Sequence, residues 1–395
     1  MAFPVELVVP TDHRFLSRPV ASPELLKIVG VDPKWADYIR VLDVDENLHL
    51  LHYLNTVISQ ENPVLNEELM KEIGHVRGTV VDSDSGKVVC RSFPFTPEAV
   101  VDDTQRFQEL VGNLNGAATF SAVEGTIVRL FFHGGEWKLC THRKLDASSS
   151  FWSGPTFGSM FNSTRKFEYT SLNKDWCYVL LLSHPGNRLV YKVEQPQLML
   201  VTIYDRASEK FLPQVDWKLP AGVVMPTIVA ASNHQELKET VNGMGSFDRS
   251  GVIVISDMTN PRPVKVINST YFVLRTTRGN EPSMRNRYLQ LRGTPQVMTL
   301  MQWYAEPEYQ TKFEEAEKEV ENLVKRMHGM YIHRYIKKNF DTLPKEEFVV
   351  LQRCHTWHST DRVKNIVTAQ KMREILNDTP NVYLLKMLKR MRESA

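Results

Sequence analysis

The chain has 395 residues, more than a single typical core needs, which predicts two or three domains. Its 42% hydrophobic and 24% charged residues and its net charge of +2 are those of an ordinary soluble protein, and no apolar run reaches the roughly 18 residues of a membrane span. The N-terminus lacks the basic region of a secretory signal, and the four cysteines are far apart without C-x-x-C spacing, so we expect an intracellular chain with free thiols.

Residues 1–75 are expected to form an N-terminal helical segment that packs on the core. Ser22 precedes Pro23, as a helix N-cap precedes a proline at the first helical position. Apolar residues from 47 to 58 recur at helical spacing, and residues 63–73 repeat the pattern. We interpret both apolar faces as core contacts rather than as a binding groove.

Residues 76–290 carry mainly strand patterns. Residues 126–132 are β-branched and aromatic, the pair Gly134-Gly135 supplies the positive φ angles of a hairpin turn, and a second strand is expected over 137–142. Asp-Ser-Gly and Pro-Gly-Asn turns elsewhere indicate further hairpins. One inserted helix is expected between Asn233 and Met244. We therefore predict an α+β fold with an antiparallel sheet and flanking helices.

Residues 295–395 predict a separate C-terminal helical domain. Apolar residues between 312 and 338 recur at three- and four-residue steps, and Pro344 and Pro380 stand where a first helical residue is expected. From Thr311 to Ala395 there are 17 Lys and Arg against 12 Asp and Glu, a net charge of +5. Such a basic region suits a phosphate backbone, although a solvated helix face is the commoner explanation.

Five motifs follow one another in the central region. Several combine a glycine with a charged or small residue at the start of an expected strand. They are Arg77-Gly78 followed by Val88–Phe95, Ala122-Val123-Glu124-Gly125, Tyr178–Arg206, Ser250-Gly251-Val252-Ile253 and Val264–Asn268.

In order and context these motifs resemble those of phage-type RNA ligases, which are covalent nucleotidyltransferases. The resemblance implies an ATP-grasp-like RNA-ligase nucleotidyltransferase domain over residues 76–290 and a C-terminal domain that helps to choose the RNA. In those enzymes a lysine at the position of Ala122 attacks ATP. Carboxylates expected near Leu180 or Leu181 and at Ser250 are absent, and Lys265 alone remains of a lysine pair.

These departures predict a ligase-like protein without catalytic residues, cofactor or metal. We therefore favour a pseudoenzyme over an active enzyme. The resemblance directs six residues to a nucleotide- or RNA-binding pocket: Arg77, Glu124, Arg129, Arg143, Lys144 and Lys265. If the pocket holds phosphates, Arg129, Arg143 and Lys265 are expected to converge on one cleft. The stretch Cys354–His358 contains three potential metal ligands, but no second pair stands at zinc-site spacing, so we interpret it as incidental.

Over its full length the chain also resembles the immediate-early infected-cell proteins of iridoviruses. A viral early protein on such a scaffold suggests non-catalytic RNA or nucleotide binding in the host cell cytoplasm or nucleus, without membrane contact. Two alternatives stay open. The scaffold is used only as a surface for a host protein, or the chain is a divergent active ligase with a displaced lysine such as Lys138 or Lys144.

Overall fold

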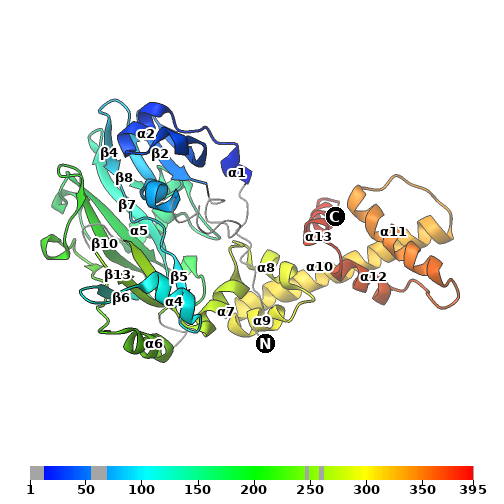
Figure 1. Ribbon diagram of the computed structural model, residues 1–395. Coiled ribbons are helices and arrows are strands. Elements are labelled where there is room, and N and C mark those ends of the chain that lie inside the picture. The colour runs from blue at the N-terminus through cyan, green and yellow to red at the C-terminus, as the bar shows by residue number, and fades with distance from the viewer. Residues whose placement is uncertain (1–12, 55–68, 245–248, 258–261, 395) are drawn as a thin grey trace. The chain divides into compact units, whose positions relative to one another are not determined.

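The computed structural model describes residues 13–54, 69–244, 249–257 and 262–394 (Figure 1). The chain divides into two compact units on either side of Phe272 and Val273. We call the first the sheet unit and the second the helical unit, and describe each by itself. Among the described residues, no helix combines the length and apolar character that a membrane crossing requires.

Three sheets, mainly antiparallel, form the sheet unit. The first is a meander of β1 (Ile39–Asp45), β2 (Leu48–Tyr53), β3 (Thr79–Asp82) and β4 (Lys87–Cys90). The second has the order β11 (Lys210–Phe211), β10 (Gln197–Asp205), β9 (Trp176–Ser183), β7 (Thr126–His133) and β8 (Glu136–Cys140), with β12 (Val223–Val224) parallel to β10. The third has the order β5 (Glu98–Val100), β14 (Pro263–Ile267), β13 (Gly251–Ile255) and β6 (Ala118–Ala122), in which β5 and β14 are parallel.

The expected hairpin is formed by β7 and β8. His133 pairs with Glu136, and the two glycines between them have φ angles of 59° and 87°, as the turn was predicted to require. The strand β8 ends at Cys140 rather than at His142, because the backbone N–H of Thr141 donates to the Lys144 carbonyl and closes a turn. The α+β class with antiparallel sheets is confirmed.

The helix expected over residues 47–58 is wrong where the structure describes it. Residues 48–53 form β2, which pairs with β1 and β3 and is buried along almost its whole length. A short apolar run fits a buried strand as well as a helix. The tight turn at Glu46, with φ of 51°, folds this run back as the second strand of a hairpin. Residues 69–73 are helical as expected, and residues 55–68 lie outside the described part.

Short helices and 3-10 turns connect these strands. Ser22 caps α2 through Leu25 N, as the sequence indicated, and Asn233 caps α6, the helix expected between Asn233 and Met244, through Glu236 N. The helices are α1 (His13–Leu16), α2 (Pro23–Val29), α4 (Thr104–Val111), α5 (Phe157–Thr164), α6 (His234–Gly243) and α7 (Ser269–Arg278). The 3-10 turns are η1 (Pro33–Tyr38), η3 (Gly74–Val76), η4 (Ala147–Ser149), η5 (Tyr169–Ser171), η6 (Pro185–Asn187) and η7 (Gln214–Asp216).

The strand β7 is buried on both faces. Val128 and Leu130 pack with Phe161 of α5, whereas Phe131 joins the core of the first sheet. The third sheet has its own core, covered by α4 and α6, which lie beside β5 and β6 in Figure 1. Any polar side chain near the middle of β7 is therefore enclosed by protein.

The helical unit is organised around the long helix α10 (Pro307–Tyr331), whose expected apolar stripe is confirmed: Phe313, Ala316, Val320, Leu323, Val324, Met327 and Tyr331 are all buried. A π-helix, η8 (Ile332–Ile336), follows directly. The other helices are α8 (Met284–Leu291), α9 (Gln296–Trp303), α11 (Lys345–Thr360), α12 (Ala369–Asn377) and α13 (Asn381–Glu393). Pro344 and Pro380 occupy the caps of α11 and α13, one residue before the expected position.

The helical unit begins earlier than the expected boundary at residue 295. The reason is visible in α8, whose Tyr288 ring stacks on the Phe313 ring of α10 with 5.2 Å between centroids. Just after α8, Arg292 forms an ion pair of 2.7 Å with Glu317. These contacts attach the segment before residue 295 to α10. The sequence of that segment carries no strand pattern, and no other local pattern assigns it to one unit or the other.

Candidate phosphate-binding site

Two motifs that are far apart in the sequence lie side by side in the third sheet. Ala122, where the sequence resemblance led us to expect a nucleophilic lysine, ends β6 and pairs with Gly251 of β13. Its carbonyl accepts from the backbone N–H of Ser250 at 2.9 Å, and its side chain is 3% exposed. The Ala122 methyl group is therefore buried at the end of a strand.

The carboxylate of Glu124 is buried and fully hydrogen-bonded. Its Oε2 accepts from the backbone N–H of Val190 at 2.9 Å and of Tyr191 at 3.3 Å, and its Oε1 accepts from the Tyr271 hydroxyl at 2.6 Å. Burial raises the pKa of Glu124, while these hydrogen bonds and the charge of Lys265 oppose the rise. The carboxylate thus holds three chain segments together.

Lys265, the best candidate of the sequence motifs, belongs to the same group. Its Nζ lies 3.5 Å from the Tyr271 hydroxyl, 4.7 Å from the centre of that ring and 3.9 Å from Glu98 Oε1. The side chain is only 16% exposed. Since Glu98 and Glu124 both lie near this ammonium, its positive charge is already balanced within the protein.

Arg129 stands in the enclosed middle of β7 and is fully buried. Its guanidinium donates to the carbonyl of Gly78, which precedes β3, and to the carbonyl of Thr141, which follows β8. These two bonds connect the first sheet with the second. Arg129 therefore has a structural role, whatever else it binds.

Arg129 is part of a group of positive and potentially positive side chains. We call Arg77, Arg129, Arg143, His52 and His142 the cation cluster. Burial first and the charges of the three arginines second lower the pKa of His52 to about 3 and that of His142 well below its usual value. Both imidazoles are therefore neutral at physiological pH.

Two arginines of the cation cluster, Arg77 and Arg129, are not balanced by an acid within the described part of the chain. Among the described residues, no carboxylate forms an ion pair with Arg77 or Arg129, and burial lowers the pKa of Arg77. The Nε2 atom of His142 is buried without a described hydrogen-bond partner. Guanidinium groups in such surroundings favour a phosphate ligand, because a phosphate supplies both the missing charge and several acceptors.

Arg143 and Lys144 lie at the edge of this cluster. Arg143 is exposed, and its guanidinium lies over the Phe15 ring at 4.7 Å from the centroid. The Nζ of Lys144 is 3.4 Å from Asp43 Oδ1, so this lysine is already ion-paired. Arg143 therefore belongs with Arg77 and Arg129, whereas Lys265 belongs with Glu124. Glu124 and Arg129 are five residues apart, a separation of about 16 Å in an extended chain.

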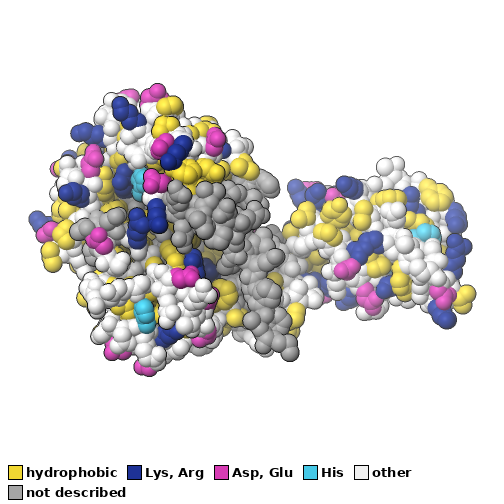
Figure 2. All heavy atoms as spheres, viewed as in Figure 1, with side chains coloured by type: hydrophobic (Ala, Val, Ile, Leu, Met, Phe, Trp, Pro, Cys, Tyr) yellow, Lys and Arg dark blue, Asp and Glu magenta, His cyan; other side chains and the backbone are white. Residues whose placement is uncertain are grey.

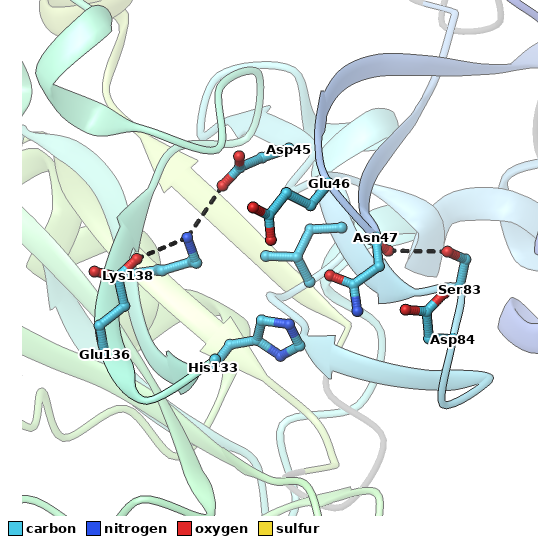
Figure 3. Close-up of a pocket in the computed structure, with 10 residues that line it drawn as sticks. Asp45, Glu46, Asn47, Ser83, Asp84, His133, Glu136 and Lys138 are labelled. Carbon is cyan, nitrogen blue, oxygen red and sulfur yellow. Dashed lines mark hydrogen bonds and ion pairs between the residues drawn. The ribbon is translucent and has the colours of Figure 1, made fainter.

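A large cavity of about 950 Å³ elsewhere in the sheet unit has the opposite charge. Three hairpin turns line it, and Figure 3 shows their acidic side chains around the opening: Asp45, Glu46, Asp84 and Glu136. Lys138 is held there at 3.0 Å from both Asp45 Oδ2 and Glu136 Oε1, and the Glu136 hydrogen bond raises its pKa. A lysine in this state is a poor nucleophile, and the cavity repels phosphates.

Sequence reasoning did not identify five residues of the cation cluster and of the group around Glu124 and Lys265: His52, His142, Glu98, Tyr191 and Tyr271. His142 stands directly before Arg143 in the sequence, so its position was a usable signal. His52 lay within the stretch that was expected to be helical. Nothing in the spacing of Glu98, Tyr191 or Tyr271 indicates that they meet Glu124 or Lys265.

No family model matches the chain. The chain is 24% identical over 331 residues to the immediate-early protein ICP-46 homolog of Invertebrate iridescent virus 6, which covers 74% of this chain and 70% of that relative. It is 25% identical to immediate-early protein ICP-46 of Frog virus 3, over 55% of this chain and 58% of that one. The resemblance to iridovirus immediate-early proteins is confirmed.

Similar solved structures are ATP-dependent ligases. One is a putative ATP-dependent DNA ligase from Aquifex aeolicus, with 14% identity, a TM-score of 0.43 and coverage of 85% of this chain and 88% of that one. Another is an archaeal ATP-dependent RNA ligase, with 14% identity, a TM-score of 0.44 and coverage of 75% and 79%. Likeness at this level concerns the fold alone.

Proposed function

We propose that this chain is a ligase-like module that binds RNA or a nucleotide through its phosphates and performs no covalent nucleotidyl transfer. The cation cluster is the observation that carries the proposal. Burying positive charge without a counterion costs free energy, and a bound phosphate offsets that cost. Arg77 and Arg129 have no described acid beside them that would do so instead.

Three features support the absence of covalent chemistry. The methyl group of Ala122 cannot attack phosphorus. The positions where the ligase resemblance calls for acids are occupied by uncharged residues, Leu180, Leu181 and Ser250, and no group of three potential metal ligands is found among the described residues. The remaining acid, Glu124, has its oxygens engaged by backbone and tyrosine donors.

Incubation of the purified chain with α-labelled ATP or GTP and magnesium or manganese is expected to leave no covalent label on the denatured protein. The reason is that a lysyl-nucleotide requires an amine at the position of Ala122. Label that survives denaturation and alkali, is released by acid, and disappears in Lys144→Ala or Lys265→Ala would contradict the proposal and would identify a displaced nucleophile.

The variant Arg77→Met is expected to bind a short single-stranded RNA at least tenfold more weakly than the wild type. A charge-assisted hydrogen bond to phosphate contributes about 1.5–3 kcal/mol, and roughly 1.4 kcal/mol is a tenfold change in affinity. Wild-type affinity should also fall as salt rises, because phosphate contacts release counterions. Fluorescence anisotropy with a labelled oligonucleotide at two salt concentrations measures both effects.

Arg106→Met is the matched control, since Arg106 is an exposed arginine of α4 that pairs with Glu109. Removal of the half-buried Arg77 charge should leave the thermal unfolding midpoint unchanged or raised, so weaker binding cannot be attributed to unfolding. Equal binding by Arg77→Met and Arg106→Met, or binding that ignores salt, would remove the cation cluster as the RNA site. The use of the scaffold as a host-protein surface would then be the better explanation.

A further inference from the structure

The helical unit contains a cavity of about 310 Å³ where α10 passes into the π-helix η8 and the chain turns toward α11. A π-helical turn inside a longer helix often marks a functional site, because it displaces side chains from their regular positions. The volume is at the lower end of small-ligand pockets, large enough for one nucleoside phosphate. The five ligase-like motifs all lie in the sheet unit, so they do not explain this cavity.

The cavity has an apolar floor. Met330 and Leu343 line it and pack against the core of the helical unit. Asn339 also lines the cavity, and its side-chain amide carries both a donor and an acceptor. An apolar surface with one amide at its edge suits a flat heterocycle, whose faces are apolar and whose edge carries hydrogen-bonding groups.

The loop over the cavity is fixed by a network around Arg334. The guanidinium lies over the rings of Phe340 at 5.4 Å and Phe348 at 5.2 Å, and it donates to the Asp341 carbonyl at 3.0 Å. His333 Nε2 lies 2.9 Å from Asp341 Oδ2. These contacts pair Asp341, the only acid among the residues that line the cavity, with His333, and they fix the shape of the opening.

The opening is positively charged. Arg326 and Arg334 line the cavity, and the exposed residues Lys337 and Lys338 follow η8 directly. Figure 2 shows Lys and Arg side chains along the edges of the helical unit, with hydrophobic side chains between them. A cationic rim above an apolar floor therefore combines phosphate attraction with a place for a base.

We propose that this cavity binds a nucleoside phosphate unit, either a free nucleotide or one unpaired residue of single-stranded RNA. The base lies against Met330 and Leu343, its edge meets Asn339, and the phosphate lies at Arg326. The site is separate from the cation cluster in the sheet unit. It does not depend on phosphate binding there, and the two sites can be tested independently.

Gly329 provides a selective test. It lines the cavity within α10, and a Cβ at this position would have no atom within 4 Å, so a side chain can leave the backbone here without an immediate clash. Gly329→Phe is expected to fill the cavity, whereas Gly329→Ala leaves most of it open. Both changes remove a glycine from a helix and should stabilise it to a similar extent.

Binding is measured on the full chain carrying Arg77→Met, so that the cation cluster contributes as little as possible. The probes are AMP and UMP, followed by isothermal titration calorimetry, and a fluorescein-labelled five-residue single-stranded RNA, followed by anisotropy. Gly329→Phe should weaken binding at least tenfold relative to Gly329→Ala. Arg326→Glu should do the same by reversing the charge of the rim.

The outcomes separate the two sources of the ligand. Binding of AMP or UMP that is lost in Gly329→Phe supports a free-nucleotide site, and loss with the oligonucleotide alone supports one residue of an RNA strand. Equal affinities of Gly329→Phe and Gly329→Ala for every probe, or no binding of any probe, would overturn the proposal. Circular dichroism confirms that the variants are folded. A failure of the cation cluster would appear instead as unchanged RNA binding in Arg77→Met alone.

Discussion

The variant Gly251→Ala is expected to lose more than about 3 kcal/mol of unfolding free energy, since few single changes disturb a sheet as directly. Gly251 begins β13 with a φ of +128°, a conformation that is almost confined to glycine. A Cβ there would lie 2.0 Å from the Val266 carbonyl oxygen of the neighbouring strand β14. The strands would have to separate to admit a single methyl group.

Gly243→Ala is the matched control in the same unit. Gly243 lies at the end of α6, its φ is not positive, and a Cβ would meet nothing within 4 Å. This change should leave stability the same or raise it slightly. Urea unfolding followed by tryptophan fluorescence compares the two variants. If Gly251→Ala unfolded at the wild-type midpoint, the description of the β13–β14 pairing would be wrong.

Glu124→Ala is expected to destabilise the sheet unit by about 3 kcal/mol, because unpaired buried donors cost roughly 1–3 kcal/mol each. The truncation leaves the backbone N–H groups of Val190 and Tyr191 and the Tyr271 hydroxyl without their acceptor. Glu124→Gln is the control: its amide oxygen can accept from both N–H groups, and the tyrosine hydroxyl can accept from its NH₂ group. Chemical unfolding at pH 7 should rank Gln close to the wild type and well above Ala.

The same pair gives a pH dependence with a defined sign. Burial raises the pKa of Glu124 above its usual value of 4.5, so the folded state binds the proton more tightly than the unfolded state does. The stability contributed by this group is fully present below pH 4.5 and is lost as the pH rises through the higher folded-state value. The stability of the wild type relative to Glu124→Gln should therefore decrease between pH 4 and pH 7. An increase over that range would mean that hydrogen bonding outweighs burial.

The parts of the fold that were predicted from sequence are those in which one local pattern allows one structure. In α10 the polar residues between the apolar ones define a single buried stripe, and in the β7–β8 hairpin Gly134 and Gly135 permit the turn directly. The strand β2 was missed because its apolar residues are contiguous, and only pairing with β1 and β3 decides between helix and strand.

The candidate site could be predicted only in part. The motifs identified Arg77, Arg129 and Arg143, and the structure groups all three around two histidines. Lys265 was expected in the same group, but residues distant in sequence, Glu98 and Tyr271, hold it elsewhere. Which charges balance one another depends on how the sheets pack, and the residues that pack together here come from separate segments of the chain.

The architecture holds Arg129 in place whether or not a ligand is bound. Its guanidinium donates to the carbonyls of Gly78 and Thr141 inside the protein. Removing it would leave two buried acceptors without a donor, and any bound ligand without this cation. Ala122, by contrast, contributes only a buried methyl group, and its side chain pairs with no polar group. Substitutions at position 129 are therefore limited by the two carbonyls that need a donor, whereas substitutions at position 122 are limited only by the space around one small side chain.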